Sequence, residues 1–166
     1  MQHYESQINK KFTLVIVDNN SSDGTKEFLE GWKQTESEFQ KEVIFLPSNT
    51  GGAGGFYAGE RYALQLNPDW VYVSDDDAYP EYQLFEKFST FISYSNEKYA
   101  AVSGTVYKSN GKDIDVNHRS LFVINKGYKF EIKAIPLEYY DKETFETGVF
   151  TYVGTFLNGE VLRQVG

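Results

Sequence analysis

The sequence feature that most constrains the fold is a short apolar run, Trp70–Val73, which leads through Ser74 into three acids, Asp75, Asp76 and Asp77. Four residues with strong β preference predict a buried strand, and the acids follow at its C-terminal end. If the extended geometry continues, side chains alternate, so that Asp75 and Asp77 lie on one side and Asp76 on the other. Two carboxylates on one side are typical of a Mg²⁺ or Mn²⁺ site with room for substrate phosphates.

The same acids have a simpler interpretation, in which they cap the following helix or lie in a solvated turn. Tyr79-Pro80-Glu81 comes soon afterwards and is typical of a helix start, because proline is favoured in the first turn of a helix. The triplet alone does not decide between the two interpretations. The segments that precede it in the sequence favour the metal-site interpretation.

Composition excludes several classes of protein. We expect residues 1–166 to form a single domain, because this length supports a substantial core. The chain has no cysteine, which excludes disulfides, zinc–thiolate sites and a cysteine nucleophile and favours a cytoplasmic location. Its formal net charge of −8, without any basic run, argues against nucleic acid or an anionic membrane as the main partner. An anionic ligand would then require a metal ion or backbone amides to compensate its charge.

A second cluster of polar residues follows the first predicted strand. Residues 12–17 form an apolar run typical of a central parallel strand, and the turn formers and helix caps of Asp18-Asn19-Asn20-Ser21-Ser22-Asp23-Gly24-Thr25 come next. Because ligands of open α/β sheets bind outside the carboxyl ends of strands, we expect this loop and the acidic triplet to face one crevice. Asp18 is then a candidate acceptor for a base or ribose. The alternatives are that Asp18 belongs to a simple turn and that Asp23 or Thr25 only caps the next helix.

A glycine-rich segment follows a predicted helix over about residues 26–33 and a predicted strand over residues 42–46. Four of its five central residues are glycines, namely Gly51, Gly52, Gly54 and Gly55, and we expect a helix to begin inside the segment or just after it. Neither the P-loop nor the dinucleotide-binding spacing is present, so both of those interpretations fail. The alternative to a ligand-binding role is a flexible turn.

The remaining segments predict the fold class. A helical apolar stripe over residues 84–92 and a buried strand over residues 99–106 continue the alternation of strands and helices, which implies a mostly parallel sheet flanked by helices. Residues 120–124 and 128–134 predict an antiparallel hairpin in the C-terminal part. We expect one of its faces to be buried, the face formed by Tyr128, Phe130, Ile132 and Ala134.

Three further expectations concern the same part of the chain. We expect His118 to be a solvated surface residue rather than an acid–base catalyst. Residues 149–153 predict a last strand. Residues 158–165 predict a terminal helix.

Three segments in this order, residues 15–25, 49–56 and 75–77, resemble family 2 glycosyltransferases of the GT-A fold. The glycine-rich segment together with a triple acid is most similar to the galactofuranosyl and rhamnosyl transferase branch. The resemblance covers about residues 12–166. It implies an α/β, Rossmann-like fold with a nucleotide-sugar-binding half over about residues 12–106 and an acceptor-side part over about residues 107–166.

The same resemblance implies the chemistry: inverting transfer of a sugar from a UDP- or dTDP-linked donor to a glycan or lipid-linked acceptor. Asp75 and Asp77 would carry the Mg²⁺ or Mn²⁺ that bridges the diphosphate. The other positions implied to bind the nucleotide sugar are Asp18, Asn20, Asp23, Asn49, Gly51, Gly52, Gly54, Gly55 and Asp76. This agrees with general chemistry, because a cation stabilises a leaving diphosphate without any proton transfer, whereas the acceptor hydroxyl needs a general base.

The chain departs from the family pattern at both ends. Family members open with a strand before the one at residue 12, and they carry their acidic general base shortly beyond the helix that ends here at Gly166. We therefore expect an internal fragment that does not turn over by itself. By resemblance we also expect a role in cell-surface polysaccharide synthesis, a cytoplasmic location and, for the full-length protein, contact with the inner membrane face.

Two other functions fit part of the pattern. A phosphorelay receiver domain also gathers acids at strand ends and binds Mg²⁺, but it needs a lysine before a late proline, and Ala134-Ile135-Pro136 lacks one. A non-catalytic relic that binds nucleotide sugars would keep the donor residues without a general base.

Overall fold

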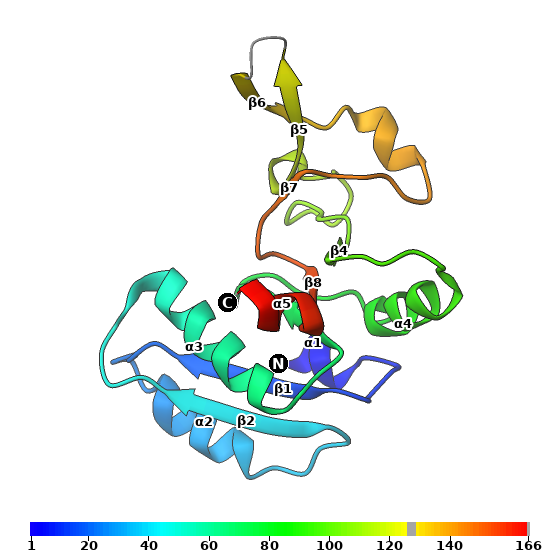
Figure 1. The fold of residues 1–166 in the computed structure, drawn as a ribbon. Helices are drawn as coiled ribbons and strands as arrows, with labels where there is room; N and C mark the ends of the chain where they lie inside the picture. Colours follow the sequence, from blue (N-terminus) through cyan, green and yellow to red (C-terminus); the bar gives the residue numbers. More distant parts are fainter. Residues whose placement is uncertain (126–128, 166) are drawn as a thin grey trace. The chain divides into compact units, whose positions relative to one another are not determined.

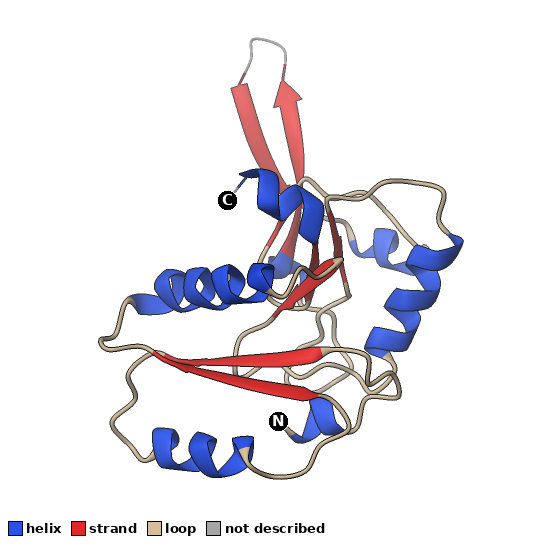
Figure 2. Ribbon diagram, turned by 60° about the horizontal axis from the view of Figure 1, so that its bottom comes forward, coloured by secondary structure: helices blue, strands red, loops and turns tan. Residues whose placement is uncertain are grey.

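The first strand of the computed structural model, β1 (Thr13–Asp18), pairs in parallel with β2 (Gln40–Phe45), so that Asp18 lies beside Phe45 at the carboxyl end of both strands. The model describes residues 1–125 and 129–165. Its mixture of helices with parallel and antiparallel strands confirms the α/β fold class (Figures 1 and 2). Residue contacts divide the chain into a first unit, Met1–Val71, Tyr79–Tyr99 and Asn158–Gly166, and a second unit, Tyr72–Ala78 and Ala100–Leu157.

Two helices pack on the parallel strands of the first unit. Helix α2 (Thr25–Lys33) buries Leu29 and Trp32, and helix α3 (Gly51–Gln65) follows β2. Figures 1 and 2 show α2 and α3 on opposite faces of the β1–β2 pair. Helix α3 lies close to β1, because a Cβ atom added at Gly59 would be 3.1 Å from a methyl carbon of Val17. Even an alanine at position 59 would therefore require Val17 or the helix to shift by a few tenths of an ångström.

The N-terminal helix α1 (Gln2–Glu5) is joined to helix α4 (Leu84–Tyr94) by the side chain of Gln7, which is 1% exposed. Its amide nitrogen donates to the carbonyl of Glu81 at 2.8 Å, and its oxygen accepts from the backbone N–H of Phe85 at 3.4 Å. The helix start expected at Tyr79-Pro80-Glu81 is wrong by a few residues, because the carbonyls of Glu81 and Tyr82 bond to Gln7 and Ile8. The apolar stripe forms α4 as expected.

Strand β3 (Trp70–Val73) belongs to a three-stranded sheet of order β3-β8-β4, in which β4 (Ala101–Ser103) runs antiparallel to β8 (Thr155–Asn158). The side chains of Ser103 and Thr155 share a hydrogen bond of 2.8 Å inside this sheet. The strand expected over residues 149–153 is shorter than predicted: β7 (Val149–Phe150) ends early, and β8 begins after Gly154, whose φ is +69°. Helix α5 (Gly159–Val165) forms the terminal helix that the sequence predicts.

A hairpin of β5 (Arg119–Asn125) and β6 (Lys129–Ala134) confirms the antiparallel element of the C-terminal part, and β7 pairs with the other edge of β5. The expectation of a buried face is wrong, because Phe130 and Ile132 are 67% and 64% exposed. Alternation of apolar and charged residues distinguishes the two faces of a strand, but it does not say whether anything covers the apolar one. Tyr128 lies outside the described residues.

Short 3₁₀ helices precede and follow the hairpin, η1 (Val116–His118) and η2 (Leu137–Asp141). Among the residues that the structure describes, none of the helices is both long and apolar enough to cross a lipid bilayer.

Candidate functional site

The carboxyl end of β1 places Asp18 in a buried position, with 5% of its surface exposed. Its carboxylate accepts a hydrogen bond from the backbone N–H of Ser21 at 3.2 Å, and its carbonyl accepts one from Leu46 at 2.9 Å. Asn20 follows with a left-handed φ of +64°, which asparagine tolerates better than most residues. The loop after β1 is therefore a turn built by Asp18, which leaves the second carboxylate oxygen as the atom through which a ligand could be held.

The glycine-rich segment meets this loop through Asn19. The side-chain oxygen of Asn19 accepts from the backbone N–H of Thr50 at 2.9 Å and from its hydroxyl at 3.1 Å. Its amide nitrogen donates to the carbonyl of Gly51 at 2.8 Å. Two of the three sequence segments that were singled out thus come together in the first unit, at the carboxyl end of the β1–β2 pair.

The structure explains why glycine occupies some positions of this segment but not others. Helix α3 starts at Gly51, whose φ is +73° and whose N–H donates to the side chain of Asn49 at 2.9 Å. A Cβ atom at Gly54 would collide with the side chain of Thr50. By contrast, a Cβ atom at Gly52 would meet nothing within 4 Å, and one at Gly55 would only make ordinary contact with Asn19, 3.8 Å away. Backbone conformation therefore accounts for Gly51 and packing for Gly54, whereas neither accounts for Gly52 or Gly55.

Asp23 has a local role at the start of α2. One carboxylate oxygen accepts from the N–H of Thr25 at 3.2 Å and from its hydroxyl at 2.6 Å, and these bonds hold the pKa of Asp23 below its usual value. The geometry is that of a turn that begins a helix, with Gly24 at φ +90° as the N-cap residue. Asp23 thus orders an exposed turn just before α2, while the N-cap position itself belongs to Gly24 and the helix has no side-chain capping bond.

The acidic triplet lies in the second unit, directly after β3. The extended geometry does not continue, because the strand ends at Val73 and the N–H of Ala78 points back to the carbonyl of Asp75 at 3.4 Å. The condition for alternating side chains, a strand that continues through the acids, is therefore not met, and the acids form an exposed turn.

The charges of the triplet nevertheless act on one another. Partial burial raises the pKa of Asp75, the negative charges of Asp77 and then Asp76 raise it further, and the charge of His118 opposes the shift. Two carboxylates that repel one another favour a cation between them. Within the described ranges, no group of three or more His, Asp or Glu side chains could hold a metal ion. A hard cation at Asp75 and Asp77 would therefore take its other ligands from water and substrate oxygens, as Mg²⁺ commonly does.

His118 is less exposed than the solvated surface residue that the sequence predicts. Its side chain is 24% exposed rather than fully solvated: the ring nitrogen Nδ1 lies 2.8 Å from the hydroxyl of Thr151, and Nε2 lies 3.7 Å from a carboxylate oxygen of Asp115. The imidazole is thus held in place within electrostatic reach of Asp75. Nothing in the local sequence around His118 indicates this, because Thr151 comes 33 residues later.

Sequence reasoning also missed Arg119, which is only 4% exposed. Its guanidinium donates to the carbonyls of His118, Val153 and Gly104 at 2.7, 2.9 and 3.0 Å, so it ties the start of β5 to the chain around β4 and β8. Burial lowers the pKa of Arg119 from its usual value. A buried cation whose described hydrogen bonds go to neutral carbonyls is costly, and here it keeps the backbone next to His118 in one arrangement.

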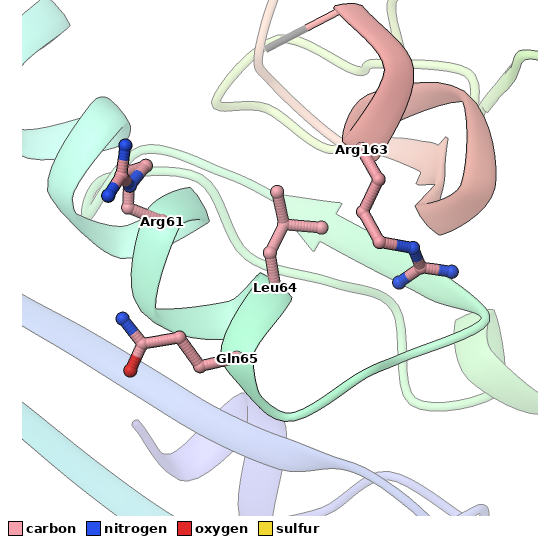
Figure 3. Close-up of a pocket in the computed structure, with 4 residues that line it drawn as sticks. All are labelled: Arg61, Leu64, Gln65 and Arg163. Carbon is pink, nitrogen blue, oxygen red and sulfur yellow. The ribbon is translucent and has the colours of Figure 1, made fainter.

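A shallow pocket of about 280 Å³ lies on the first unit, between α3 and α5. Figure 3 shows its lining residues, Arg61, Leu64 and Gln65 of α3 and Arg163 of α5. The two guanidinium groups point away from one another (Figure 3), and they donate to the hydroxyl of Tyr57 and to the carbonyl of Pro68, both at 3.3 Å. The pocket therefore does not present a converging pair of cations to a ligand.

Comparison with known proteins agrees with the sequence pattern. Residues 3–162 match the family model described as Glycosyl transferase family 2. The chain is similar to a protein named Galactofuranosyltransferase GlfT1 from Mycolicibacterium smegmatis, with 35% identity over 75 residues. The matched part is 45% of this chain and spans 23% of the length of that relative. No solved structure matches the chain.

Proposed function

The chain belongs to glycosyl transferase family 2, and from this we propose that it serves in metal-dependent, inverting transfer of a sugar from a nucleotide diphosphate donor. The observation that carries the proposal is the exposed acidic turn after β3, where three consecutive carboxylates meet and where partial burial, followed by the charge of Asp77, raises the pKa of Asp75. Such a pair gains most from a divalent cation. The name of the similar protein suggests a galactofuranosyl donor, which makes UDP the first nucleotide to test. The proposed acceptor is a glycan or a lipid-linked glycan.

The proposed chemistry assigns the diphosphate end of the donor to the acidic turn. Asp75 and Asp77 would hold Mg²⁺ or Mn²⁺, and the bound cation would supply charge stabilisation for the leaving nucleoside diphosphate. Asp76 is proposed to contact the ribose. His118, held by Thr151, would keep a positive or hydrogen-bonding group next to Asp75.

The nucleoside end is assigned to the first unit. Asp18 offers a carboxylate oxygen to a base or ribose, and the first turn of α3 offers backbone N–H groups that have no partner inside the helix. Gly52 and Gly55 leave that turn open to close approach, since no packing contact of the protein explains them. Asn20, Asp23, Asn49, Gly51 and Gly54 are proposed to shape the same surface and contact the donor from it.

Calorimetry with UDP and dTDP, with and without Mn²⁺, tests this function. We expect UDP to bind only with the metal and the Asp77→Ala variant to lose at least about 10-fold in affinity, because one metal ligand is removed. Asp69→Ala, which removes another exposed carboxylate before the same strand, is the matched control and should bind like the unmodified chain. Equal UDP affinity without metal, or in Asp77→Ala, would contradict the proposal.

A further inference from the structure

We infer that Asn19 is a positioning residue for donor binding: its side chain fixes the first turn of α3 against the end of β1. The inference rests on the proposed function, in which this turn approaches the donor. Asn19 is distinct from the residues assigned above to the donor, since all of its described side-chain hydrogen bonds go to the protein itself.

The three hydrogen bonds of Asn19 require an asparagine. One terminal atom accepts two hydrogen bonds from Thr50, and the other donates one to the carbonyl of Gly51. Only a primary amide combines two acceptor sites with a donor on so short a side chain. Serine is too short to span both partners, and aspartate has no donor.

Helix α3 depends on this contact because it lacks the usual local support. Thr50 is its N-cap residue, yet the hydroxyl of Thr50 makes no capping bond to the helix and donates to Asn19 instead. Four of the first five residues of α3 are glycines, the poorest helix formers apart from proline. A helix start of this composition frays readily unless something outside the helix holds it.

The place of the contact gives it a functional consequence. The first N–H groups of a helix point outward along its axis without intrahelical partners, so they are hydrogen-bond donors that the proposed function offers to the nucleoside end of the donor. Asn19 sets the direction of this turn relative to Asp18, its neighbour at the end of β1. Loss of the side chain would therefore leave the N–H donors present but no longer pre-organised, which lowers affinity without removing any group that touches the donor.

The test combines amide hydrogen exchange with UDP titration in the presence of Mn²⁺. For Asn19→Ala we expect the amides of residues 50–55 to exchange at least about 10-fold faster and UDP affinity to fall about 10-fold. Asn19→Asp keeps both acceptor bonds to Thr50, so it should restore the protection of the Thr50 amide. Asn9→Ala is the matched control, since Asn9 also accepts from a backbone N–H, that of Lys11 at 2.9 Å, and it should leave both measurements unchanged.

A merely structural role would lower the melting temperature of Asn19→Ala while leaving UDP affinity unchanged well below that temperature. Unchanged UDP affinity in Asn19→Ala, or unchanged exchange at residues 50–55, would overturn the inference. If the unmodified chain itself fails to bind UDP with Mn²⁺, the proposed function falls and takes the inference with it. The two failures are distinguishable, because only the second involves the unmodified chain.

Discussion

At the scale of single residues, Asp75 combines partial burial with two negative neighbours in the same turn. These causes raise its pKa, and His118 is the opposing charge that faces it. In the folded state without metal, Asp75 therefore holds its proton more tightly than it does in the unfolded chain. Its ionised form is the one that costs stability, and it is also the form that binds a cation.

Removal of the Asp75 charge should therefore stabilise the metal-free protein. Because folding raises the pKa of Asp75, the protonated carboxyl contributes its full stabilisation below the unfolded pKa of 3.8. This contribution is lost as the pH rises through the pKa of Asp75 in the folded state. We expect Asp75→Asn to be more stable than the unmodified chain at pH 7, by less than about 1 kcal/mol because the group is largely exposed. The difference should vanish below about pH 4 in urea unfolding experiments. Lower stability of Asp75→Asn at pH 7 would contradict the assignment.

The glycines of α3 give a second prediction. At Gly52 an alanine meets open space, so Gly52→Ala should stabilise the fold by up to about 1 kcal/mol while weakening UDP binding. At Gly54 the new methyl group collides with Thr50, so Gly54→Ala should destabilise the fold by about 1–3 kcal/mol. Urea unfolding of both variants measures the contrast. Equal stability changes would show that the two glycines are retained for the same reason.

Strand-end acids could be predicted from the sequence, whereas their partners could not. Asp18 and Asp75 follow runs of β-forming residues, and this pattern is local. Asn19 and His118 act through Thr50 and Thr151, which lie 31 and 33 residues away in the chain. Only the fold brings such partners together, so the anchoring role of Asn19 and the partial burial of His118 had no signal in the sequence around them.

At the scale of elements, the hairpin has exposed apolar side chains on its strands, and a buried one follows shortly after its second strand. Ile132 on β6 is 64% exposed, whereas Ile135, which follows the strand, is 2% exposed. Facing pairs of the hairpin, Phe122 with Ile132 and Ile124 with Phe130, carry the exposed apolar face. Stability should therefore depend on the residue after the strand more than on the strand face.

The same substitution at the two isoleucines tests this. Ile132→Thr should change the free energy of unfolding by no more than about 0.5 kcal/mol, because a largely exposed side chain loses little contact. Ile135→Thr should cost about 2–4 kcal/mol, since it removes buried methylene area and buries a hydroxyl. Chemical denaturation compares the two. A large loss in Ile132→Thr would show that something covers this face in solution.

The elements themselves were predicted to different degrees. Strands β1 and β3 and helix α3 follow from apolar runs and from the glycine segment that begins α3. Strand β8 was not anticipated, because its four residues directly precede α5 and appear as part of one irregular segment. The predicted start of α4 was too early. The carbonyls of Glu81 and Tyr82, which would lie in the first turn of the predicted helix, accept tertiary hydrogen bonds from Gln7 and Ile8 instead.

At the scale of the whole molecule, charge sets the conditions for donor binding. The chain carries 24 acidic and 16 basic residues, a formal net charge of −8, and the proposed ligand is a dianion or more. Long-range repulsion therefore opposes binding unless a cation is present where the diphosphate is held.

The thermodynamic consequence is a coupling between metal and nucleotide. If Mn²⁺ raises the affinity for UDP by a given factor, UDP must raise the affinity for Mn²⁺ by the same factor. We expect this factor to be at least about 10. Without Mn²⁺ the negatively charged UDP meets the negatively charged acidic turn, and without UDP the bound Mn²⁺ lacks the ligands that the diphosphate oxygens would supply.

The most direct test is a Mn²⁺ titration followed by electron paramagnetic resonance, with and without UDP, on the unmodified chain and on Asp75→Asn and Asp77→Asn. The account predicts that UDP tightens Mn²⁺ binding in the unmodified chain and that either substitution removes the effect. A Mn²⁺ affinity that is the same with and without UDP would contradict the prediction. So would an effect of UDP on Mn²⁺ affinity that persists in both variants.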